Sequence, residues 1–344
     1  MAYTTINKPN THMNTVLYTG NSSTQAVTGV GFQPDWVWLK ARSESASHEI
    51  FDVVRGVTKT INSNTTNAEA TQTDSLTAFD SDGFTLGSNG DLNYNASTYV
   101  GWNWLANGTP SSNTDGSITS SVSANTTSGF SIVSYTGTGA VATVGHGLGV
   151  APSMIIFKNR DTTNNWNVYH TSLGNGKFIR LNDTGAEANT GRFNNTSPTS
   201  SVFSLGVNGA TAVNGNGNSI IAYCFAEKQG YSKFGSYVGN GSTDGTFIYT
   251  GFKPAFVLIK KSSGSASWMM YDNARDPDNV AGNYLYANES AAAQTASQGM
   301  DFLSNGIKMT NTFGDANESG QTYIYLAFAE NPLVGTNNVP ATAR

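Results

Sequence analysis

The sequence has little of what most catalytic and nucleic-acid-binding sites require. Its 344 residues include one cysteine and four histidines, only 12% of the side chains are charged, and the net charge is −5. A single cysteine cannot form a disulfide within the chain, and Cys224 lies in an apolar segment, so we expect it to be a small core residue. A weakly acidic chain cannot neutralise phosphates, so we expect no nucleic-acid partner.

Long apolar runs are also missing. No segment approaches the roughly 20 apolar residues of a membrane-spanning helix, so we expect no insertion into a membrane. The first ten residues have no basic stretch followed by an apolar core, so we expect no signal peptide. Such a protein would be made in the cytoplasm and reach any outside location by another route, such as assembly into a particle.

Motifs for catalysis and for metal binding are not found. The histidines have no metal-ligand spacing, and we expect them to lie at the surface. Glu49 and Asp52, with Arg55 nearby, come closest to the paired carboxylates of a glycosidase, but the pair does not recur along the chain and we expect it in a solvated loop. The sequence therefore predicts no enzyme, no cofactor and no metal site. The four histidines are His12, His48, His146 and His170.

What the sequence does contain is one pattern written three times. In each copy an apolar run leads from a proline to a lysine six residues later, and an aromatic-polar pair ends 18 residues after the proline. A second apolar segment then closes the copy. The proline-to-lysine segments are 31–40, 149–158 and 251–260, and the closing segments are 98–104, 219–225 and 322–328. Matching offsets at several places predict three related modules.

The predicted fold class is all-β. Aromatic residues make up 11% of the chain, and short apolar runs alternate with glycine, asparagine and aspartate turns, which is typical of strands and hairpins. Hairpin turns are predicted at 82–83, 208–209 and 305–306. Helical periodicity is limited to one or two turns near 67–70 and 290–297. Each module is therefore predicted to be a β-sandwich.

The proline-to-lysine strand of each module is apolar on both faces. Trp36 and Trp38 point to one side and Val37 and Leu39 to the other, because side chains alternate along a strand. One face can meet the opposite sheet of the same module, but the other needs a loop, a neighbouring module or another subunit. We therefore predict that the modules pack against a neighbour and are not independent domains on a flexible chain.

The repeat divides the chain into modules and connections. The second and third modules follow one another without slack, so we expect them to be fixed in orientation. The arm and the tail are polar and extended and could clasp a neighbour. The predicted parts are an arm at 1–15, modules at 16–108, 130–229 and 230–332, a linker at 109–129 and a tail at 333–344.

Aromatic side chains are the one feature that could bind a ligand. Most tryptophans align with apolar residues of the other modules, so we expect them in the core. Trp166 and Trp268 fall near loop ends and are the candidate ligand-binding residues, with packing as the competing interpretation. The tryptophans assigned to the core are Trp36, Trp38, Trp102 and Trp104.

The first module resembles a module of virion proteins from tailed bacteriophages, especially marine ones, which are commonly labelled tail fibre or structural protein. The segments that carry the resemblance are 1–6, 17–21, 31–40, 52–56, 76–87 and 99–104. The resemblance implies a concanavalin-like jelly-roll sandwich. It is specific over 1–108 and looser over the other modules, and it brings no catalytic residues with it.

These observations predict a non-enzymatic virion component made of three tandem jelly-roll modules, either a tail-associated appendage or a capsid-decoration protein. The expected partners are other virion proteins, further copies of the chain in a homo-oligomer, and a host-surface glycan. A carbohydrate-binding module for receptor recognition is the second hypothesis and can coexist with the first. A polysaccharide-degrading enzyme is the third. The tail is preferred over the head only because the family is usually labelled so.

Overall fold

The computed structural model describes residues 2–207, 210–337 and 339. It confirms the all-β class. The short helices of the described residues are α1 (Gly90–Asn93), α2 (Ala210–Val213) and the 3-10 turn η1 (Pro9–Thr11). They do not coincide with the weak helical periodicity in the sequence. The alanine-rich stretch near 290–297 leads instead into strand β25 (Gln294–Leu303), and the stretch near 67–70 leads into β6 (Ala70–Thr71).

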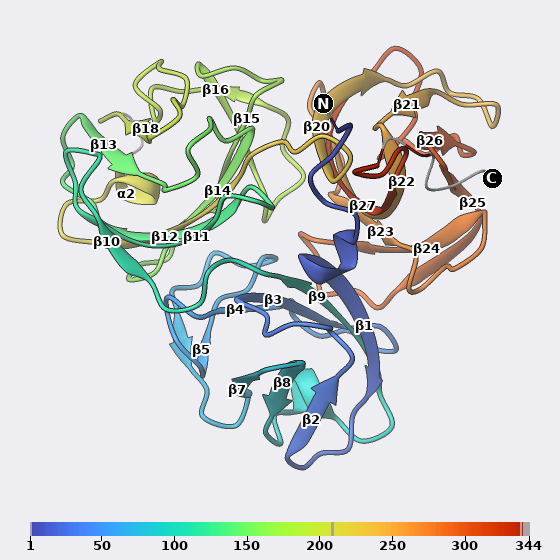
Figure 1. Cartoon of the computed structure of the whole chain (residues 1–344), viewed down its shortest axis with the longest axis horizontal. Helices are drawn as coiled ribbons and strands as arrows, with labels where there is room; N and C mark the ends of the chain where they lie inside the picture. The colour runs from blue at the N-terminus through green and yellow to red at the C-terminus, as the bar shows by residue number, and fades with distance from the viewer. Residues whose placement is uncertain (1, 208–209, 338, 340–344) are drawn as a thin grey trace.

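Three large sheets share one order of four antiparallel strands (Figure 1). In the first sheet the order is β1 (Met13–Thr19), β9 (Thr98–Trp104), β3 (Trp36–Ala41) and β4 (Glu49–Asp52). The second repeats it with β12 (Phe130–Thr136), β19 (Ser219–Phe225), β14 (Met154–Asn159) and β15 (Asn167–His170). The third uses β20 (Ser232–Val238), β27 (Thr322–Pro332), β22 (Phe252–Lys261) and β23 (Met269–Asp272). We call the strands β1–β9 the first unit, β10–β19 the second and β20–β27 the third.

The two apolar segments of the sequence repeat are neighbouring central strands in all three sheets. The residue two positions after each repeat proline faces the same point of the closing strand. These pairs are Trp36 with Trp104, Met154 with Phe225, and Phe256 with Phe328. A central strand that is covered on both faces needs apolar side chains at every position, which explains the unbroken apolar runs.

The stretch 109–129, predicted as a linker, carries two strands instead. β10 (Ser111–Asn113) and β11 (Ser120–Asn125) extend the second sheet by pairing next to β12. The prediction was wrong because serine, threonine and asparagine dominate this stretch, whereas its few apolar core contacts come from Ile118, Val122 and Ala124. The backbone ladder and those few side chains are enough to place it against the sheet.

A smaller sheet faces the large one in the first two units, and in the third unit the large sheet curls back on itself. The opposing strands of the first unit are β2 (Gln25–Thr28), β8 (Gly83–Leu86) and β7 (Leu76–Asp80), and those of the second are β13 (Ala142–Gly145) and β18 (Val202–Leu205). In the third they are β25, β26 (Gly306–Met309) and β21 (Phe247–Tyr249), reached through β24 (Ala281–Tyr286). The remaining strands are β5 (Lys59–Thr60), which pairs with β6, and β16 (Lys177–Arg180) and β17 (Ala188–Asn189), which follow β15.

Two of the predicted hairpin turns are present in the described residues. One joins β7 to β8 around Asp82, and the other joins β25 to β26 around Asn305. The turn expected at residues 208–209 lies outside the described residues.

The three units surround one central core. The inner faces of the three large sheets contribute to a single apolar cluster, and the opposite faces pack within each unit as three separate clusters. Trp36 and Trp38 lie in the central cluster, whereas Val37 and Leu39 lie in the core of the first unit. This confirms that the apolar strands are covered on both sides, and that the second cover comes from the neighbouring units (Figure 1).

The N-terminal arm crosses from the first unit to the third. Ile6 packs into the central core, and the Tyr3 hydroxyl donates to the carbonyl of Gly251. Asn7 bonds to Thr336 in the tail through both its side-chain amide and its side-chain carbonyl. The arm is therefore bonded to other parts of the same chain, and a clasp on a neighbour stays a prediction.

Candidate functional site

The junctions between units hold most of the buried polar groups that the sequence offered as functional candidates. At each junction the residue 12 positions after the repeat proline donates its backbone N–H to a carbonyl of another unit. These bonds are Ala46 to Ser290 (3.0 Å), Asn164 to Thr66 (2.9 Å) and Ala266 to Thr184 (2.9 Å). The first unit thus binds the third, the second binds the first and the third binds the second. We call these bonds, together with the side-chain hydrogen bonds described below that join the same three units, the junction ring.

Trp166 and Trp268, the predicted ligand-binding residues, are members of the junction ring. The Trp166 Nε1–H donates to the carbonyl of Asn62 at 2.8 Å, and the Trp268 Nε1–H donates to the carbonyl of Arg180 at 2.7 Å. The two side chains are 0% and 1% exposed. A sugar platform needs an exposed indole face, so their burial argues against the predicted role and favours the packing interpretation.

His48 occupies the corresponding position in the first unit. Its Nδ1 accepts the Trp38 Nε1–H at 2.8 Å, which places the ring proton on Nε2, and Nε2 lies 2.9 Å from the carbonyl of Tyr286 in the third unit. Burial, followed by the charge of Lys40, holds the pKa of His48 well below its usual range. The neutral imidazole therefore bonds its unit to a backbone carbonyl of another unit, as the two indoles do.

A second set of contacts runs around the ring in the opposite direction. Asp52 accepts the Tyr223 hydroxyl of the second unit at 2.7 Å, and Asp272 accepts the Trp102 Nε1–H of the first unit at 3.0 Å. The corresponding residue of the second unit is His170, whose Nε2 lies 3.2 Å from the carbonyl of Tyr325 in the third unit. Each unit thus reaches the closing strand of the next one.

The charge of each buried carboxylate in this set is balanced within its own unit. Arg55 pairs with Asp52 at 2.5 Å and Arg275 with Asp272 at 2.6 Å, with all four side chains fully buried. In the second unit the same two positions carry His170 and Leu173. The ion pair is therefore replaced by a neutral pair, which avoids an uncompensated charge in the core.

The repeat lysines Lys40, Lys158 and Lys260 also lie at the junctions and are fully buried. Their Nζ atoms donate to backbone carbonyls, two of which belong to the preceding unit: Lys158 reaches Thr66 and Lys260 reaches Thr184. Burial lowers the pKa of each lysine to about 8. The lysine that ends each apolar run is thus part of the core.

The histidines and carboxylates lie elsewhere than the sequence predicted. His48, His146 and His170 are buried, not at the surface, and His12 is half-buried. Glu49 and Asp52 are 1% and 0% exposed, not in a solvated loop. Burial raises the pKa of Glu49 to about 7, and its Oε2 accepts from the Thr60 hydroxyl at 3.0 Å. The burial of these histidines and carboxylates could not be predicted from composition, because the number of charged residues does not show which of them lie inside the molecule.

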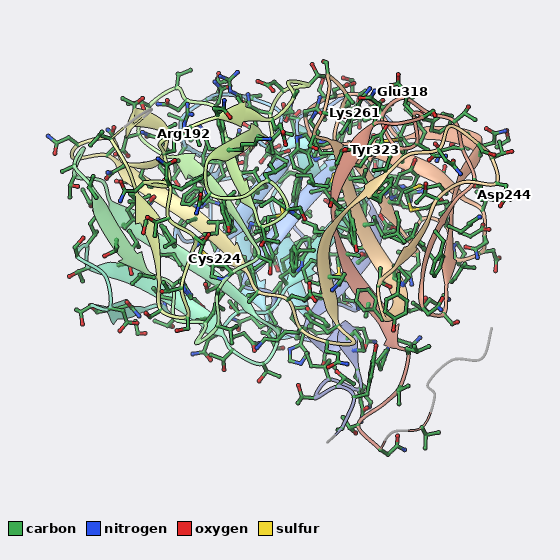
Figure 2. The ribbon with its side chains drawn as sticks, turned by 90° about the horizontal axis from the view of Figure 1, so that it is seen from above. Arg192, Cys224, Asp244, Lys261, Glu318 and Tyr323 are labelled. Atoms are coloured by element: carbon green, nitrogen blue, oxygen red, sulfur yellow. The ribbon has the colours of Figure 1, made fainter. Side chains whose placement is uncertain are left out.

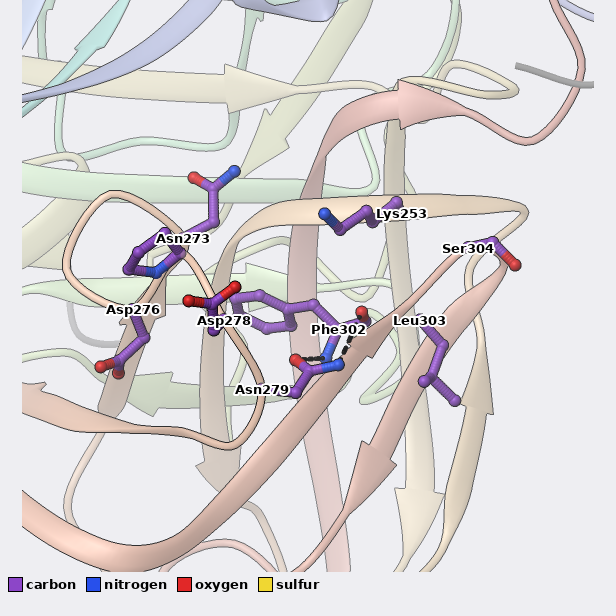
Figure 3. Close-up of a pocket in the computed structure, with 9 residues that line it drawn as sticks. Lys253, Asn273, Asp276, Asp278, Asn279, Phe302, Leu303 and Ser304 are labelled. Carbon is purple, nitrogen blue, oxygen red and sulfur yellow. Dashed lines mark hydrogen bonds between the residues drawn. The ribbon is translucent and has the colours of Figure 1, made fainter. Parts of the chain in front are cut away.

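A small pocket of about 130 Å³ opens on the third unit (Figure 3). Its wall is the loop 276–279, which belongs to a four-residue insertion relative to the other units. Asn279 fixes that loop by bonding to the backbone of Phe302 through both its amide and its carbonyl. Lys253 at the rim pairs with Glu330 at 2.8 Å. The pocket can take a small polar group, and its shape comes from the insertion.

The large aromatic side chains that are exposed were not among the predicted ligand-binding residues. Tyr94, Phe247 and Tyr249 are 57%, 44% and 54% exposed. Phe247 and Tyr249 alternate along β21 with a buried Ile248, so their period of two was the available signal.

The described residues contain neither a metal-binding cluster nor a membrane-spanning helix. Within 2–207, 210–337 and 339, no three His, Cys, Asp or Glu side chains are grouped so that they could hold a metal ion. No helix in that same part of the chain is long and apolar enough to cross a membrane.

Comparison with known proteins identifies a family. A family model described as a domain of unknown function, DUF7483, matches residues 8–332. No curated protein and no solved structure matches the chain.

Proposed function

This chain belongs to the DUF7483 family, and we propose that it is a non-enzymatic structural component of a tailed-bacteriophage particle. The observation that carries the proposal is the junction ring. Buried acids, bases and indoles that could serve a reaction or a ligand bond the three units to one another. Three units that are bonded to one another in this way form a rigid building block, which suits assembly into a particle. The resemblance of residues 1–108 to virion modules supports the same role.

Each unit is proposed to be a concanavalin-like jelly-roll module. Support comes from the shared strand order of the large sheets and from the opposing strands that pack against them in each unit. One chain then provides an approximately threefold body. Other virion proteins are the proposed partners, and the virion is the proposed location.

The proposal is tested by locating the protein on intact particles. Particles purified through a density gradient and a high-salt wash are analysed by mass spectrometry and by immunogold electron microscopy. The protein should persist in a fixed ratio to the major capsid protein and label one defined site, on the head or on the tail. Its loss in the wash, or its presence only in infected-cell lysate, would reject a structural role.

Recognition of a host-surface glycan is the second proposed function. The observation that favours it is the pair of exposed aromatic residues on β21, because the indoles first considered are buried. The polysaccharide-degrading alternative is not proposed, since the carboxylates that could have supported it, Glu49 and Asp52, lie inside the molecule.

A further inference from the structure

Strand β21 of the third unit presents two aromatic rings to solvent. Phe247 and Tyr249 are 44% and 54% exposed, whereas Ile248 between them is 5% exposed and packs into the core of the third unit. β21 is the last strand of its sheet and pairs on one side with β26 (Figure 1). The two rings therefore lie on the outer face of an edge strand.

The corresponding strands of the other units show that packing does not require aromatic residues here. Ile248 matches Val27 in β2 and Val144 in β13, and all three point into the core of their unit. The outward positions are Ala26 and Thr28 in the first unit, Thr143 and Gly145 in the second, and Phe247 and Tyr249 in the third. Aromatic residues stand at the outward positions only in the third unit.

A glycine on the neighbouring strand makes room for the Phe247 ring. Tyr249 lies opposite Gly306, and a Cβ atom added to Gly306 would lie 2.9 Å from the Phe247 ring. The Phe247 ring therefore occupies space that a side chain at position 306 would fill. The N-terminal arm reaches the second ring, because the hydroxyls of Tyr3 and Tyr249 both lie beside Gly251, at 2.6 Å and 3.6 Å from a Cβ atom added there.

Charged groups lie next to the rings on the same face. Lys308 is opposite Phe247 on one side and opposite Asp301 on the other, so the three form one row across β21, β26 and β25. Asp301 Oδ1 is covered and has no hydrogen-bond partner among the described residues. Lys308 pairs with Asp244 at 2.7 Å, at the outer margin of the molecule (Figure 2).

We infer that this surface, the β21 face (Phe247, Tyr249, Asp301, Leu303, Gly306 and Lys308), binds the pyranose rings of a polysaccharide. A solvent-exposed aromatic ring can stack against the C–H face of a sugar, and a carboxylate and an ammonium group beside it can bond to hydroxyls. The centre of a protein–protein interface is depleted in lysine and aspartate, which argues against a protein partner here. The inference rests on the second proposed function, glycan recognition, and does not depend on where in a particle the protein is found.

Polysaccharide binding by the full chain tests the inference. An array of purified bacterial surface polysaccharides is probed with the wild-type protein, and the dissociation constant for the best binder is measured by titration calorimetry. Phe247→Ala and Tyr249→Ala should each weaken binding about tenfold, because each removes one stacking surface. Asp301→Asn should weaken it less. Tyr94→Ala is the matched control, because Tyr94 is equally exposed but lies in the first unit, and its affinity should equal that of wild type.

Two outcomes would overturn the inference. One is binding that Phe247→Ala and Tyr249→Ala leave unchanged, or no binding on the array at all, while the melting temperatures show that the variants are folded. The other is a self-associating protein in sedimentation analysis that Phe247→Ala converts to a monomer, which would assign the face to a second copy of the chain. Neither outcome bears on the particle-location experiment, so failure of the inference is distinguishable from failure of the proposed function.

Discussion

At the scale of single residues, Asp52 shows how a buried charge is accommodated. Its carboxylate accepts from Arg55 inside the first unit and from Tyr223 of the second unit, and no water-exposed path to the side chain exists because it is 0% exposed. Removing one partner of such a pair is costly because the other charge is left without compensation.

Asp52→Asn should therefore lower the free energy of unfolding by about 3–5 kcal/mol, as measured by urea denaturation. The second unit offers a matched rescue, because it carries His170 and Leu173 at the corresponding positions. The double variant Asp52→His/Arg55→Leu should be more stable than Asp52→His alone. A double variant that is no better would show that charge balance is not what the pair provides.

Trp166 and Trp268 are predicted to matter for stability. Either Trp→Ala change removes a fully buried indole and its hydrogen bond, and should cost about 3–5 kcal/mol in chemical denaturation. Trp268→Phe should cost less, since it retains most of the apolar contact. Variants with wild-type stability would mean that the two indoles are exposed in solution.

Acid should weaken the junction ring through its histidines. Burial lowers the pKa of His170 to about 4, against about 6.5 in the unfolded chain. Below pH 6.5 the unfolded chain therefore binds more protons than the folded one, and the free energy of unfolding decreases as the pH decreases. Glu49 acts in the opposite sense between about pH 7 and 4.5, because its pKa is raised on folding. We therefore expect Glu49→Gln to steepen the loss of stability between pH 6.5 and 4.5 in urea titrations. A flat profile in that variant would contradict the assignment of neutral histidines.

At the scale of elements, the sequence repeat predicted the central strands well and their surroundings poorly. The segments 31–40 and 98–104 became adjacent strands because an unbroken apolar run needs cover on both faces. The strands within 109–129 were missed because their order comes from the backbone ladder and from few apolar contacts. The burial of His48, Glu49 and Asp52 was missed because the polarity of a residue does not show whether the folded core provides it with a hydrogen-bonding or charged partner.

The same limit applies to the lysine that ends each central strand. The offset from the proline was visible in the sequence, but the full burial of Lys40, Lys158 and Lys260 was not. It depends on backbone carbonyls that the fold brings to each Nζ, and for Lys158 and Lys260 these include a carbonyl of a neighbouring unit. Three equivalent lysines with a pKa near 8 give the chain a testable alkaline response.

Stability should rise as the pH increases from 8 to about 9.5. Over that range the unfolded lysines, with a pKa of about 10.4, still bind protons that the folded ones have released, so the folded state is favoured. Lys158→Met and Lys260→Met should each reduce the slope of unfolding free energy against pH by about a third. Equal slopes in all three proteins would show that the buried lysines do not titrate as described.

At the scale of the whole molecule, three units that share one core and bond in both directions around a ring should not unfold independently. The central cluster draws side chains from all three large sheets, and the arm ties the first unit to the third. Chains of separate domains usually unfold in steps, whereas a single shared core gives one cooperative transition.

The chain contains its own reporter of that cooperativity. Cys224 is the only cysteine, is fully buried in β19 of the second unit, and has a pKa raised by burial, so it reacts with a thiol reagent only when the unit opens. The rate of labelling in increasing urea therefore gives the free energy of opening of the second unit alone.

The most direct test compares Cys224 labelling in the wild type with labelling in Asp272→Ala, a change that removes the acceptor of the Trp102 Nε1–H and so cuts this bond between the third unit and the first. The shared core and the junction ring predict that the opening free energy at Cys224 falls by the same amount as the global unfolding free energy measured by circular dichroism. A Cys224 that labels at the wild-type rate while the third unit is destabilised would contradict the account.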